Sequence, residues 1–365
     1  MSNVVISGYY GSRNAGDEAM LAAMVEVLSD LDPKVNITVI SANPQDTRQR
    51  HGVKAVGWLD LAGILGALRH GDILLSGGGS LLQNVTSRRS LYYYLLIIWL
   101  AQLLGTAVML YAQGIGPING RIARWIMGYI GNRVKMITVR DRGSLKELAS
   151  LGITRPPIEP TADPVHAIHQ VDTTQGREIL LKHGALVGKK PLVCISVREW
   201  CNMNHYKEIV AQAADRIVED FQAQVVFLPM QYPEDVKTAQ LVADMAQHEM
   251  LVLPEEYNTS QLLSIVGNMD LLISIRLHAL IFAGVMGVPM IGISYDPKVD
   301  RFLESVGEES VGTLENVELE KLMAQVHLKW KDREGFSQQN EQLFDDLRHL
   351  AMCNAELAYS VIGKD

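Results

Sequence analysis

The residues best suited to chemistry stand at the ends of apolar runs in the second half of the chain. Arg198 follows the run Cys194–Val197, and Arg276 and His278 follow Leu271–Ile275. A buried arginine needs an anionic partner, because burying an unpaired charge is costly. If the chain is still extended there, the side chains of residues 276 and 278 point the same way. The site would then combine a guanidinium, an imidazole and the start of the next helix, which together suit a small, multiply charged anion. The alternative is structural, because a lone histidine in an apolar segment often only packs in the core.

Lys298 follows the next apolar run, Met290–Ser294, where it would either add positive charge to the same site or remain solvated. The ten histidines show no HxH or HExxH spacing, and no DxD pair has a useful spacing for a metal. We therefore expect no metal and no cofactor.

The first apolar run ends in a glycine-rich segment, Gly8–Glu18, that fits neither common nucleotide-phosphate motif. It lacks the GxGxxG and GxxxxGK[ST] patterns, and the carboxylates of Asp17 and Glu18 would repel a phosphate. One interpretation is that Asn14 and Asp17 only order the loop and cap the following helix. The other is that they bind sugar hydroxyls and that a carboxylate acts as a base.

Other candidate positions follow later strands of the first half. Gly78 and Gly79 would expose backbone amides that either hold an anion or only permit a turn. Arg140 ends another apolar run beside Asp141, and a local ion pair is its simplest explanation. Asp163 lies near the expected boundary between two lobes, where a structural role is the alternative.

Composition and charge exclude several classes of protein. The chain has 365 residues, 48% of them hydrophobic, which suits about two domains with sizeable cores. A formal net charge of −8 argues against a nucleic-acid-binding surface. The three cysteines have no paired or metal-binding spacing, and the first residues lack the basic and apolar regions of a signal peptide. We expect a cytoplasmic protein that binds no nucleic acid.

Apolar runs and helical patterns alternate along the chain, which predicts parallel sheets covered by helices. In the first half we expect strands at Val4–Ser7, Ile37–Ile40, Ile73–Ser76, Ala107–Ala112, Met136–Val139 and Ile158–Ala162, and helices at Glu18–Leu31, Leu59–Leu68, Leu91–Leu104, Arg121–Asn132 and Arg142–Leu151. After a polar stretch at 165–191 we expect strands at Leu192–Val197, Val225–Leu228, Leu251–Leu253, Leu271–Ile275 and Met290–Ser294, and helices at Tyr206–Asp220, Asp235–Gln247, Ser260–Gly267 and Ala279–Gly287, before a helical tail.

This alternation predicts an α/β protein of two Rossmann-like, doubly wound parallel-sheet lobes with a cleft between them. We expect the first lobe at 1–168, the second at 169–345, and a C-terminal helix at 346–365 that crosses back to the first. Ligands of open α/β sheets bind beyond the carboxyl ends of the strands, so the residues just after each strand are the informative ones.

The uncharged stretch Leu91–Ala112 is about as long as a membrane-spanning helix. Gly105 divides it, and the second part runs into a turn-rich segment. We therefore expect a buried helix followed by a buried strand.

Several segments resemble the polysaccharide pyruvyl transferase family, nearly end to end from Gly8 to Phe302. The segments that carry the resemblance are GYYGSRNAGDE, LLSGGGSLLQ, YAQGIGP, TVRDRGS, ISVREW, LPMQ and, most specifically, ISIRLHALIFAGVMGVPMIGISYD. More narrowly, the sequence is similar to the CsaB-type enzymes of bacterial cell-wall polymers. The resemblance implies a GT-B-like fold and the transfer of pyruvate from phosphoenolpyruvate onto two hydroxyls of a sugar, which gives a cyclic ketal and phosphate.

The resemblance also implies residue roles. The donor-site arginines of the family correspond to Arg198 and Arg276, and its Leu-His pair corresponds to Leu277 and His278. Two guanidinium groups would bind the phosphate and the carboxylate of the donor. His278 would protonate the terminal carbon of the enol.

A base for the sugar hydroxyls should come from the first lobe. Asp17 is our first choice, followed by Glu18 and Asp163.

The resemblance implies that the acceptor is a lipid-diphosphate-linked disaccharide with N-acetylmannosamine as its outer sugar, met at the inner face of the cell membrane. Arg88, Arg89 and the three tyrosines that follow, and then the segment Arg121–Arg133, mix arginines with large apolar residues. This mixture is typical of helices in the headgroup region of a membrane. An ordinary surface helix, with its apolar face in the core, is an equal alternative.

Two other functions remain open at this stage. The first is a nucleotide-sugar glycosyltransferase of the same two-lobed architecture. The second is a non-catalytic two-lobed sensor of a small anion.

Overall fold

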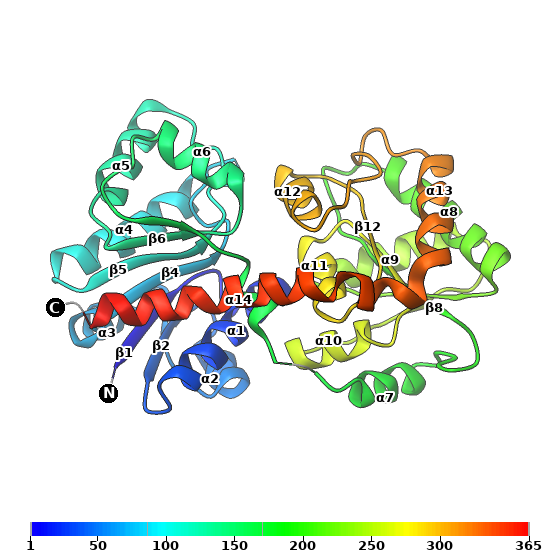
Figure 1. Ribbon diagram of the computed structural model, residues 1–365, viewed down its shortest axis with the longest axis horizontal. Helices are drawn as coiled ribbons and strands as arrows, with labels where there is room; N and C mark the ends of the chain where they lie inside the picture. The colour runs from blue at the N-terminus through cyan, green and yellow to red at the C-terminus, as the bar shows by residue number, and fades with distance from the viewer. Residues whose placement is uncertain (1, 86, 170, 364–365) are drawn as a thin grey trace. The chain divides into compact units, whose positions relative to one another are not determined.

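A computed structural model describes residues 2–85, 87–169 and 171–363 (Figure 1). The chain forms two compact α/β units. The first contains residues 1–12, 17–168 and 346–365, and the second contains residues 13–16 and 169–345. The short segment 13–16, expected in the first lobe, therefore packs with the second unit.

The first unit is built on a seven-stranded parallel sheet with the strand order β3-β2-β1-β4-β5-β6-β7. Its strands are β1 (Asn3–Ser7), β2 (Asn36–Ser41), β3 (Lys54–Gly57), β4 (Ile73–Gly79), β5 (Ala107–Gln113), β6 (Met136–Val139) and β7 (Ile158–Pro160). The central strands β4 and β5 are buried along their whole length, as expected for strands covered on both faces. The strand order reverses between β1 and β4, which makes their carboxyl ends the natural binding edge of this sheet.

Several helices of the first unit begin where a side chain caps free backbone amides. The helices of this unit are α1 (Ala15–Leu31), α2 (Pro44–His51), α3 (Leu61–His70), α4 (Arg88–Leu103), α5 (Arg121–Gly131), α6 (Arg142–Ser150) and the short 3₁₀ helix η1 (Pro164–Ala167). Asn43, Asp60 and Ser87 each accept a hydrogen bond from a backbone N–H of the helix they precede, in α2, α3 and α4 respectively.

The last helix, α14 (Phe336–Ile362), contributes its C-terminal half to the first unit. Ala351, Ala355 and Ala358 are buried in the same core cluster as the strands β1, β4 and β5. Tyr359 donates a hydrogen bond to the carbonyl oxygen of Leu28 in α1, 2.9 Å away. Small side chains at helical spacing therefore let this helix lie close against the first unit.

The second unit contains a five-stranded parallel sheet with the order β10-β9-β8-β11-β12. Its strands are β8 (Leu192–Ser196), β9 (Gln224–Phe227), β10 (Leu251–Val252), β11 (Leu271–Ser274) and β12 (Met290–Gly292). Its helices are α7 (Thr174–Lys182), α8 (His205–Phe221), α9 (Glu234–Met245), α10 (Thr259–Val266), α11 (Leu277–Val285), α12 (Pro297–Ser305), α13 (Leu319–Asp332) and the 3₁₀ helix η2 (Arg333–Gly335). Here the order reverses between β8 and β11, so the ends of these two strands form the binding edge.

The predicted fold class is confirmed, because each unit is a parallel sheet with helices between successive strands. The uncharged stretch Leu91–Ala112 forms most of α4 and the strand β5, with Gly105 between them at a φ of 80°. Among the described residues, no helix has both the length and the apolar character needed to cross a membrane.

Candidate functional site

The turn after β11 places Arg276 and His278 differently from the extended arrangement that we expected. The Ser274 hydroxyl accepts a hydrogen bond from Arg276 N at 2.8 Å and donates one to Arg276 O at 2.9 Å, which closes a tight turn at the end of the strand. Helix α11 then begins at Leu277, so His278 lies in its first turn. The chain is therefore not extended through 278, because the helix starts two residues earlier than its apolar pattern indicated. Leu277 itself is buried.

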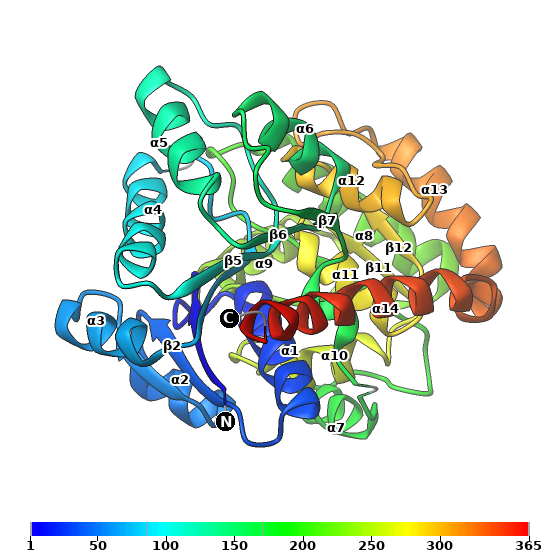
Figure 2. The same ribbon diagram turned by 60° about the vertical axis from the view of Figure 1, so that its left-hand side comes forward.

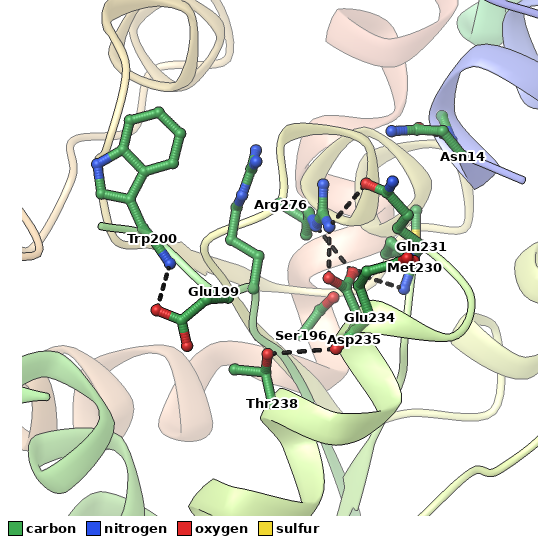
Figure 3. Close-up of polar contacts among 12 residues, drawn as sticks. Asn14, Ser196, Glu199, Trp200, Met230, Gln231, Glu234, Asp235, Thr238 and Arg276 are labelled. Atoms are coloured by element: carbon green, nitrogen blue, oxygen red, sulfur yellow. Dashed lines mark hydrogen bonds and ion pairs between the residues drawn. The ribbon is translucent and has the colours of Figure 1, made fainter. Parts of the chain in front are cut away.

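Arg276 is held by a buried carboxylate that the sequence analysis did not select. Its Nε donates to Asp235 Oδ2 at 2.9 Å, and its Nη2 donates to Asp235 Oδ1 and, at 3.3 Å, to Gln231 Oε1 (Figure 3). Asp235 is 1% exposed. Asp235 is therefore the anionic partner that the buried Arg276 requires. Hydrogen bonds to Asp235 and Gln231 already engage two of the three guanidinium nitrogens, Nε and Nη2.

Asp235 also orders the loop that follows β9. The carboxylate accepts hydrogen bonds from the backbone N–H groups of Met230, at 3.1 Å, and Gln231, at 3.0 Å. Four donors thus converge on one buried carboxylate, as the burial of a charged group requires. One feature of the sequence could have pointed to Asp235 as a site residue. It lies in the first turn of α9, shortly after β9, and β9 is next to β8 in the sheet.

The segment 13–16 is joined to this loop by backbone hydrogen bonds. Ala15 N donates to Met230 O at 2.8 Å, and Asn14 forms an isolated antiparallel bridge with Gln231. Figure 3 shows Asn14 beside Gln231. Asn14 Oδ1 also accepts a hydrogen bond from Gly16 N at 3.0 Å, as the capping interpretation expected. The glycine-rich motif and the LPMQ motif thus meet within the second unit.

Gly16 lies directly against the imidazole of His278. A Cβ added at Gly16 would come within 3 Å of three ring atoms, so no larger residue fits without moving the ring. Arg13–Gly16, Gln231, Arg276 and His278 therefore form one contiguous constellation in the second unit.

Arg198 follows β8 and is only partly satisfied by the protein. Its Nη1 donates to the Tyr295 hydroxyl at 2.8 Å, and its guanidinium carbon lies 4.7 Å from the centre of the Tyr295 ring and 5.0 Å from that of Trp200. Its Nε is buried and makes no hydrogen bond within the described part of the chain. A buried donor without an acceptor is costly, so this atom marks a place where an anion would be stabilised.

Tyr295, which follows β12, is surrounded by cations and was not among the expected site residues. Burial alone would raise the pKa of its hydroxyl, but Lys298, Arg198 and Arg276 outweigh burial and hold the pKa below its ordinary value. Lys298 Nζ lies 5.1 Å from the ring centre, and 3.8 Å from Asp296 Oδ2. The ends of β8, β11 and β12 therefore bring three cations, Arg198, Arg276 and Lys298, around Tyr295. Asp235 and Asp296 balance part of this charge.

In the first unit, the buried Glu18 side chain holds the glycine-rich loop in place. Its Oε1 accepts a hydrogen bond from Gly11 N at 2.7 Å, and its Oε2 lies 2.9 Å from His51 Nε2. The side chains of Glu18 and His51 are 3% and 4% exposed. Both carboxylate oxygens are thus engaged in holding the glycine-rich loop.

Arg140 and Asp163 form a buried ion pair with each other. Arg140 also donates to Ser80 Oγ at 3.3 Å, and Asp163 caps the 3₁₀ helix η1. Asp141, the neighbour of Arg140 in the sequence, caps α6 by accepting a hydrogen bond from Ser144 N at 2.8 Å. Arg140 lies at the end of β6 and Asp163 just beyond β7, and neighbouring parallel strands bring them together.

Gly78 and Gly79 lie beside Asp17 at the end of β4. Both have positive φ angles, 70° and 90°, which favour glycine. A Cβ on Gly79 would lie 3.4 Å from Asp17 Oδ1, and one on Gly78 would lie 3.0 Å from the hydroxyl of Tyr10. Burial, and then the charge of Asp17, raise the pKa of Tyr10. Asp17 therefore lies at the β1/β4 edge of the first sheet.

No cluster of three or more His, Cys, Asp or Glu in the described parts of the chain is arranged to hold a metal ion.

The family model described as polysaccharide pyruvyl transferase matches residues 14–297. The chain belongs to this enzyme family. The match starts at Asn14, in the segment that joins the second unit, and ends at Pro297, one residue before Lys298. It thus covers the Asp235–Arg276 pair, His278 and Tyr295.

Solved structures of GT-B proteins share the fold of this family member at low sequence identity. An UDP-GlcNAc 2-epimerase from Methanocaldococcus jannaschii has a TM-score of 0.67 and 12% identity, with 98% of this chain and 100% of the other covered. A glycosyltransferase from Rickettsia africae has a TM-score of 0.65 and 11% identity, with 100% and 99% covered. Anabaena HepE, solved with UDP and glucose, has a TM-score of 0.64 and 10% identity, with both chains covered completely. These likenesses show the GT-B-like fold. No curated protein matches the chain.

Proposed function

We propose that this protein transfers pyruvate from phosphoenolpyruvate onto two hydroxyls of a sugar, forming a cyclic ketal and releasing phosphate. The observation that carries the proposal is the positive cluster of Arg198, Arg276 and Lys298 around Tyr295, with a buried Arg198 Nε that makes no hydrogen bond. A compact donor with a phosphate and a carboxylate on adjacent groups would satisfy several of these cations at once. The family membership supports the same reaction class.

His278 is proposed as the acid that starts the reaction. Proton transfer to the terminal carbon of the enol leaves the neighbouring carbon electron-deficient, so a sugar hydroxyl adds to it. A second hydroxyl then displaces phosphate at the same carbon and closes the ketal ring. In total, one carbon–hydrogen bond and two carbon–oxygen bonds to the sugar form, and the carbon–oxygen bond to phosphate breaks. Of the two protons that the hydroxyls lose, one replaces the proton given by His278 and the other leaves with the phosphate.

Asp17 is proposed as the base for the hydroxyl protons. Asp17 lies beside Gly79 at the end of β4, whereas Glu18 holds Gly11 N and His51 and Asp163 pairs with Arg140. Asn14, Gly78, Gly79 and Leu277 remain proposed as residues that shape the substrate sites. Arg140 is better explained by its ion pair.

The acceptor is proposed to be a lipid-diphosphate-linked disaccharide of a cell-wall polymer, with N-acetylmannosamine outermost, met at the cytoplasmic face of the membrane. This specificity rests on the resemblance to CsaB-type enzymes. A mass gain of one pyruvate ketal on an acceptor analogue, seen by mass spectrometry, would identify the sugar directly.

The decisive test replaces the proposed acid. His278→Ala should reduce phosphate release from phosphoenolpyruvate by roughly 10²–10⁴-fold, the range usual for a general acid, while the thermal unfolding transition stays cooperative. Calorimetry should still detect phosphoenolpyruvate, because the arginines remain. Retention of most of the activity would reject this role for His278.

A second candidate function is nucleotide-sugar glycosyl transfer. It is favoured by the fold shared with Anabaena HepE, which was solved in complex with UDP and glucose. Calorimetry with phosphoenolpyruvate and with UDP-sugars separates the two functions. Phosphate release that depends on a sugar acceptor would further exclude a non-catalytic anion sensor.

A further inference from the structure

The middle of the first unit carries an unusual charge distribution. Between residues 73 and 140 the chain has no aspartate or glutamate, whereas it has seven basic residues. They are Arg88, Arg89, Arg121, Arg124, Arg133, Lys135 and Arg140. The chain as a whole has a net charge of −8, so this positive segment stands against an acidic remainder.

Helix α4 exposes an apolar stripe on its outer face. Tyr92, Leu96, Trp99 and Leu103 follow at intervals of four, three and four residues, so they lie on one side of the helix. Their exposed fractions range from 39% to 62%. The opposite face, with Leu91, Leu95 and Ile98 among others, is buried in the core. The helix is thus apolar on both sides, which packing within the unit does not explain.

Helix α5 repeats this arrangement. Ile122, Trp125 and Tyr129 are 71%, 69% and 44% exposed and share one face, while Ala123, Met127 and Ile130 are buried. Trp125 stacks on Tyr129 with the ring centres 5.7 Å apart, and the guanidinium of Arg133 lies 3.5 Å from the centre of the Tyr129 ring. Large aromatic side chains and a cation therefore form one ordered row on the surface.

The start of α3 extends the same surface. Trp58, Leu59 and Leu61 are exposed, and Trp58 contacts Tyr93 of α4 edge-on, with ring centres 5.9 Å apart. The Tyr93 hydroxyl donates to Trp58 O at 2.9 Å. Helices α3, α4 and α5 follow one another along one side of the unit, at the left of Figure 2. We call the exposed apolar side chains on this side of the unit the α3–α5 apolar face. They are Trp58, Leu59, Leu61, Tyr92, Leu96, Trp99, Leu103, Ile122, Trp125 and Tyr129.

Of the arginines at or near α4 and α5, four lie around the α3–α5 apolar face, whereas Arg124 does not. Arg88 and Arg121 each stand one helical turn before an exposed aromatic residue, Tyr92 and Trp125, and both are exposed. Arg89 and Arg133 are exposed as well. Arg124 is different, since it is turned onto α6, where it donates to Ser150 O at 2.8 Å and to Glu147 Oε1 at 3.3 Å.

We propose that the α3–α5 apolar face docks on the headgroup layer of an anionic phospholipid bilayer. Tryptophan and tyrosine prefer that layer, because it holds their apolar rings and their polar groups together. Arginines beside them are attracted by anionic lipids, and the absence of acidic residues from 73 to 140 removes the opposing repulsion. Asp60 lies between Leu59 and Leu61 at the α3 edge of the face, so the acid-free part is that formed by α4 and α5. A soluble protein partner would not require such an acid-free stretch. The proposal does not depend on the pyruvyl transfer reaction.

Vesicle co-sedimentation of the full chain tests the proposal. We expect the protein to bind vesicles that contain phosphatidylglycerol and to bind neutral phosphatidylcholine vesicles much more weakly. Ile122→Ser/Trp125→Ser should reduce binding at least about tenfold, by removing apolar surface that enters the lipid. Arg88→Glu/Arg89→Glu/Arg121→Glu should reduce it roughly a hundredfold, since it reverses three charges near the anionic surface.

Matched controls come from the second unit. Leu241→Ser/Leu328→Ser removes two exposed leucines, and Lys189→Glu/Lys190→Glu/Lys321→Glu reverses three exposed charges. Both should leave vesicle binding unchanged, and every variant should keep the cooperative thermal unfolding transition of the wild type. Failure of the wild type to bind anionic vesicles overturns the proposal, as does equal loss in the control variants. A wild-type dimer that Ile122→Ser/Trp125→Ser converts to a monomer also overturns it, because a second copy would then cover the face.

Discussion

The Nδ1 edge of the His278 imidazole is packed onto the backbone of Gly16. A Cβ at Gly16 would lie 2.0 Å from Nδ1, 2.5 Å from Cγ and 2.7 Å from Cε1 of that ring. No rotation of a methyl group relieves such overlaps, so the position is restricted to glycine unless the ring moves. The segment that supplies Gly16 is itself fixed by the hydrogen bond from Ala15 N to Met230 O.

Gly16→Ala should therefore displace His278 and damage catalysis more than folding. We expect the rate of phosphate release to fall about a hundredfold, because misplacing a catalytic group by about 1 Å has that effect. The free energy of unfolding should fall by roughly 1–3 kcal/mol, as for other overpacked sites. Steady-state kinetics and urea unfolding measure the two effects.

The matched control is Gly66→Ala in α3, where an added Cβ meets no atom within 4 Å. It should keep full activity and gain up to about 1 kcal/mol, since alanine favours a helix over glycine. If Gly16→Ala keeps the wild-type rate, the position of His278 against Gly16 has no bearing on catalysis.

The Asp235–Arg276 pair should prove essential to the donor site. Asp235→Asn leaves the buried guanidinium without its countercharge, which should lower the free energy of unfolding by about 3–5 kcal/mol. It should also weaken phosphoenolpyruvate binding, because Arg276 and the loop at Met230 lose their common anchor. Calorimetry and chemical denaturation measure these changes.

Two further variants separate structure from function at this pair. Asp244→Asn removes an exposed carboxylate from the same helix and should change neither quantity. The double variant Asp235→Leu/Arg276→Met should recover much of the lost stability, since a buried pair can be replaced by apolar residues, but it should not recover donor binding. Recovery of binding in the double variant would show that neither charge serves the donor.

The sequence was most informative where strands are buried on both faces. Continuous apolar runs such as Met136–Val139 and Ile73–Ser76 mark β6 and the start of β4, because such strands need apolar side chains on both sides. The helix α2 and the strand β3 were missed. In α2 only Thr47 is buried, so its sequence carries no hydrophobic period, and β3 is a short edge strand.

The site was less predictable, because its key contacts join residues far apart in the chain. Arg276 could be selected from its place after an apolar run, but its partner Asp235 is 41 residues earlier and resembles an ordinary acid at a helix start. Tyr295 gains its character only from cations that three different strand ends supply. The pairing of Gly16 with His278 likewise requires the hydrogen bonds of the 13–16 segment.

The lowered pKa of Tyr295 predicts a pH dependence of donor binding. When the hydroxyl ionises it cancels part of the positive charge that attracts the donor, so affinity for phosphoenolpyruvate should fall as the pH rises through this pKa. Conversely, a bound anion should raise the pKa of Tyr295, and binding at a pH near that pKa should take up a proton. Calorimetry in buffers of different ionisation enthalpy measures that uptake.

The ionisation of Tyr295 should also change the free energy of unfolding, which should rise with pH while the affinity for the donor falls. The pKa of Tyr295 is lower in the folded protein than the value of about 10 expected for the unfolded chain, so its contribution to the free energy of unfolding grows as the pH rises from one to the other. That contribution is lost as the pH falls through the folded value. Tyr295→Phe should abolish both effects, whereas Tyr92→Phe, at an exposed position, should abolish neither. A pH-independent affinity in the wild type over this window would contradict the assignment.

Variants of the neighbouring carboxylates Asp17 and Glu18 should distinguish an effect on turnover from an effect on the free energy of unfolding. Glu18→Gln disturbs a buried carboxylate that binds Gly11 N and His51, so we expect a loss of about 1–3 kcal/mol in the free energy of unfolding and little change in turnover at a temperature where the protein is folded. Asp17→Asn should reduce turnover about 10²–10⁴-fold, as removal of a general base does, which is a much larger loss of turnover than Glu18→Gln causes. Because the two residues are adjacent, each variant serves as the control for the other. Turnover and denaturation curves that change in parallel in both variants would show that Asp17, like Glu18, only orders the loop.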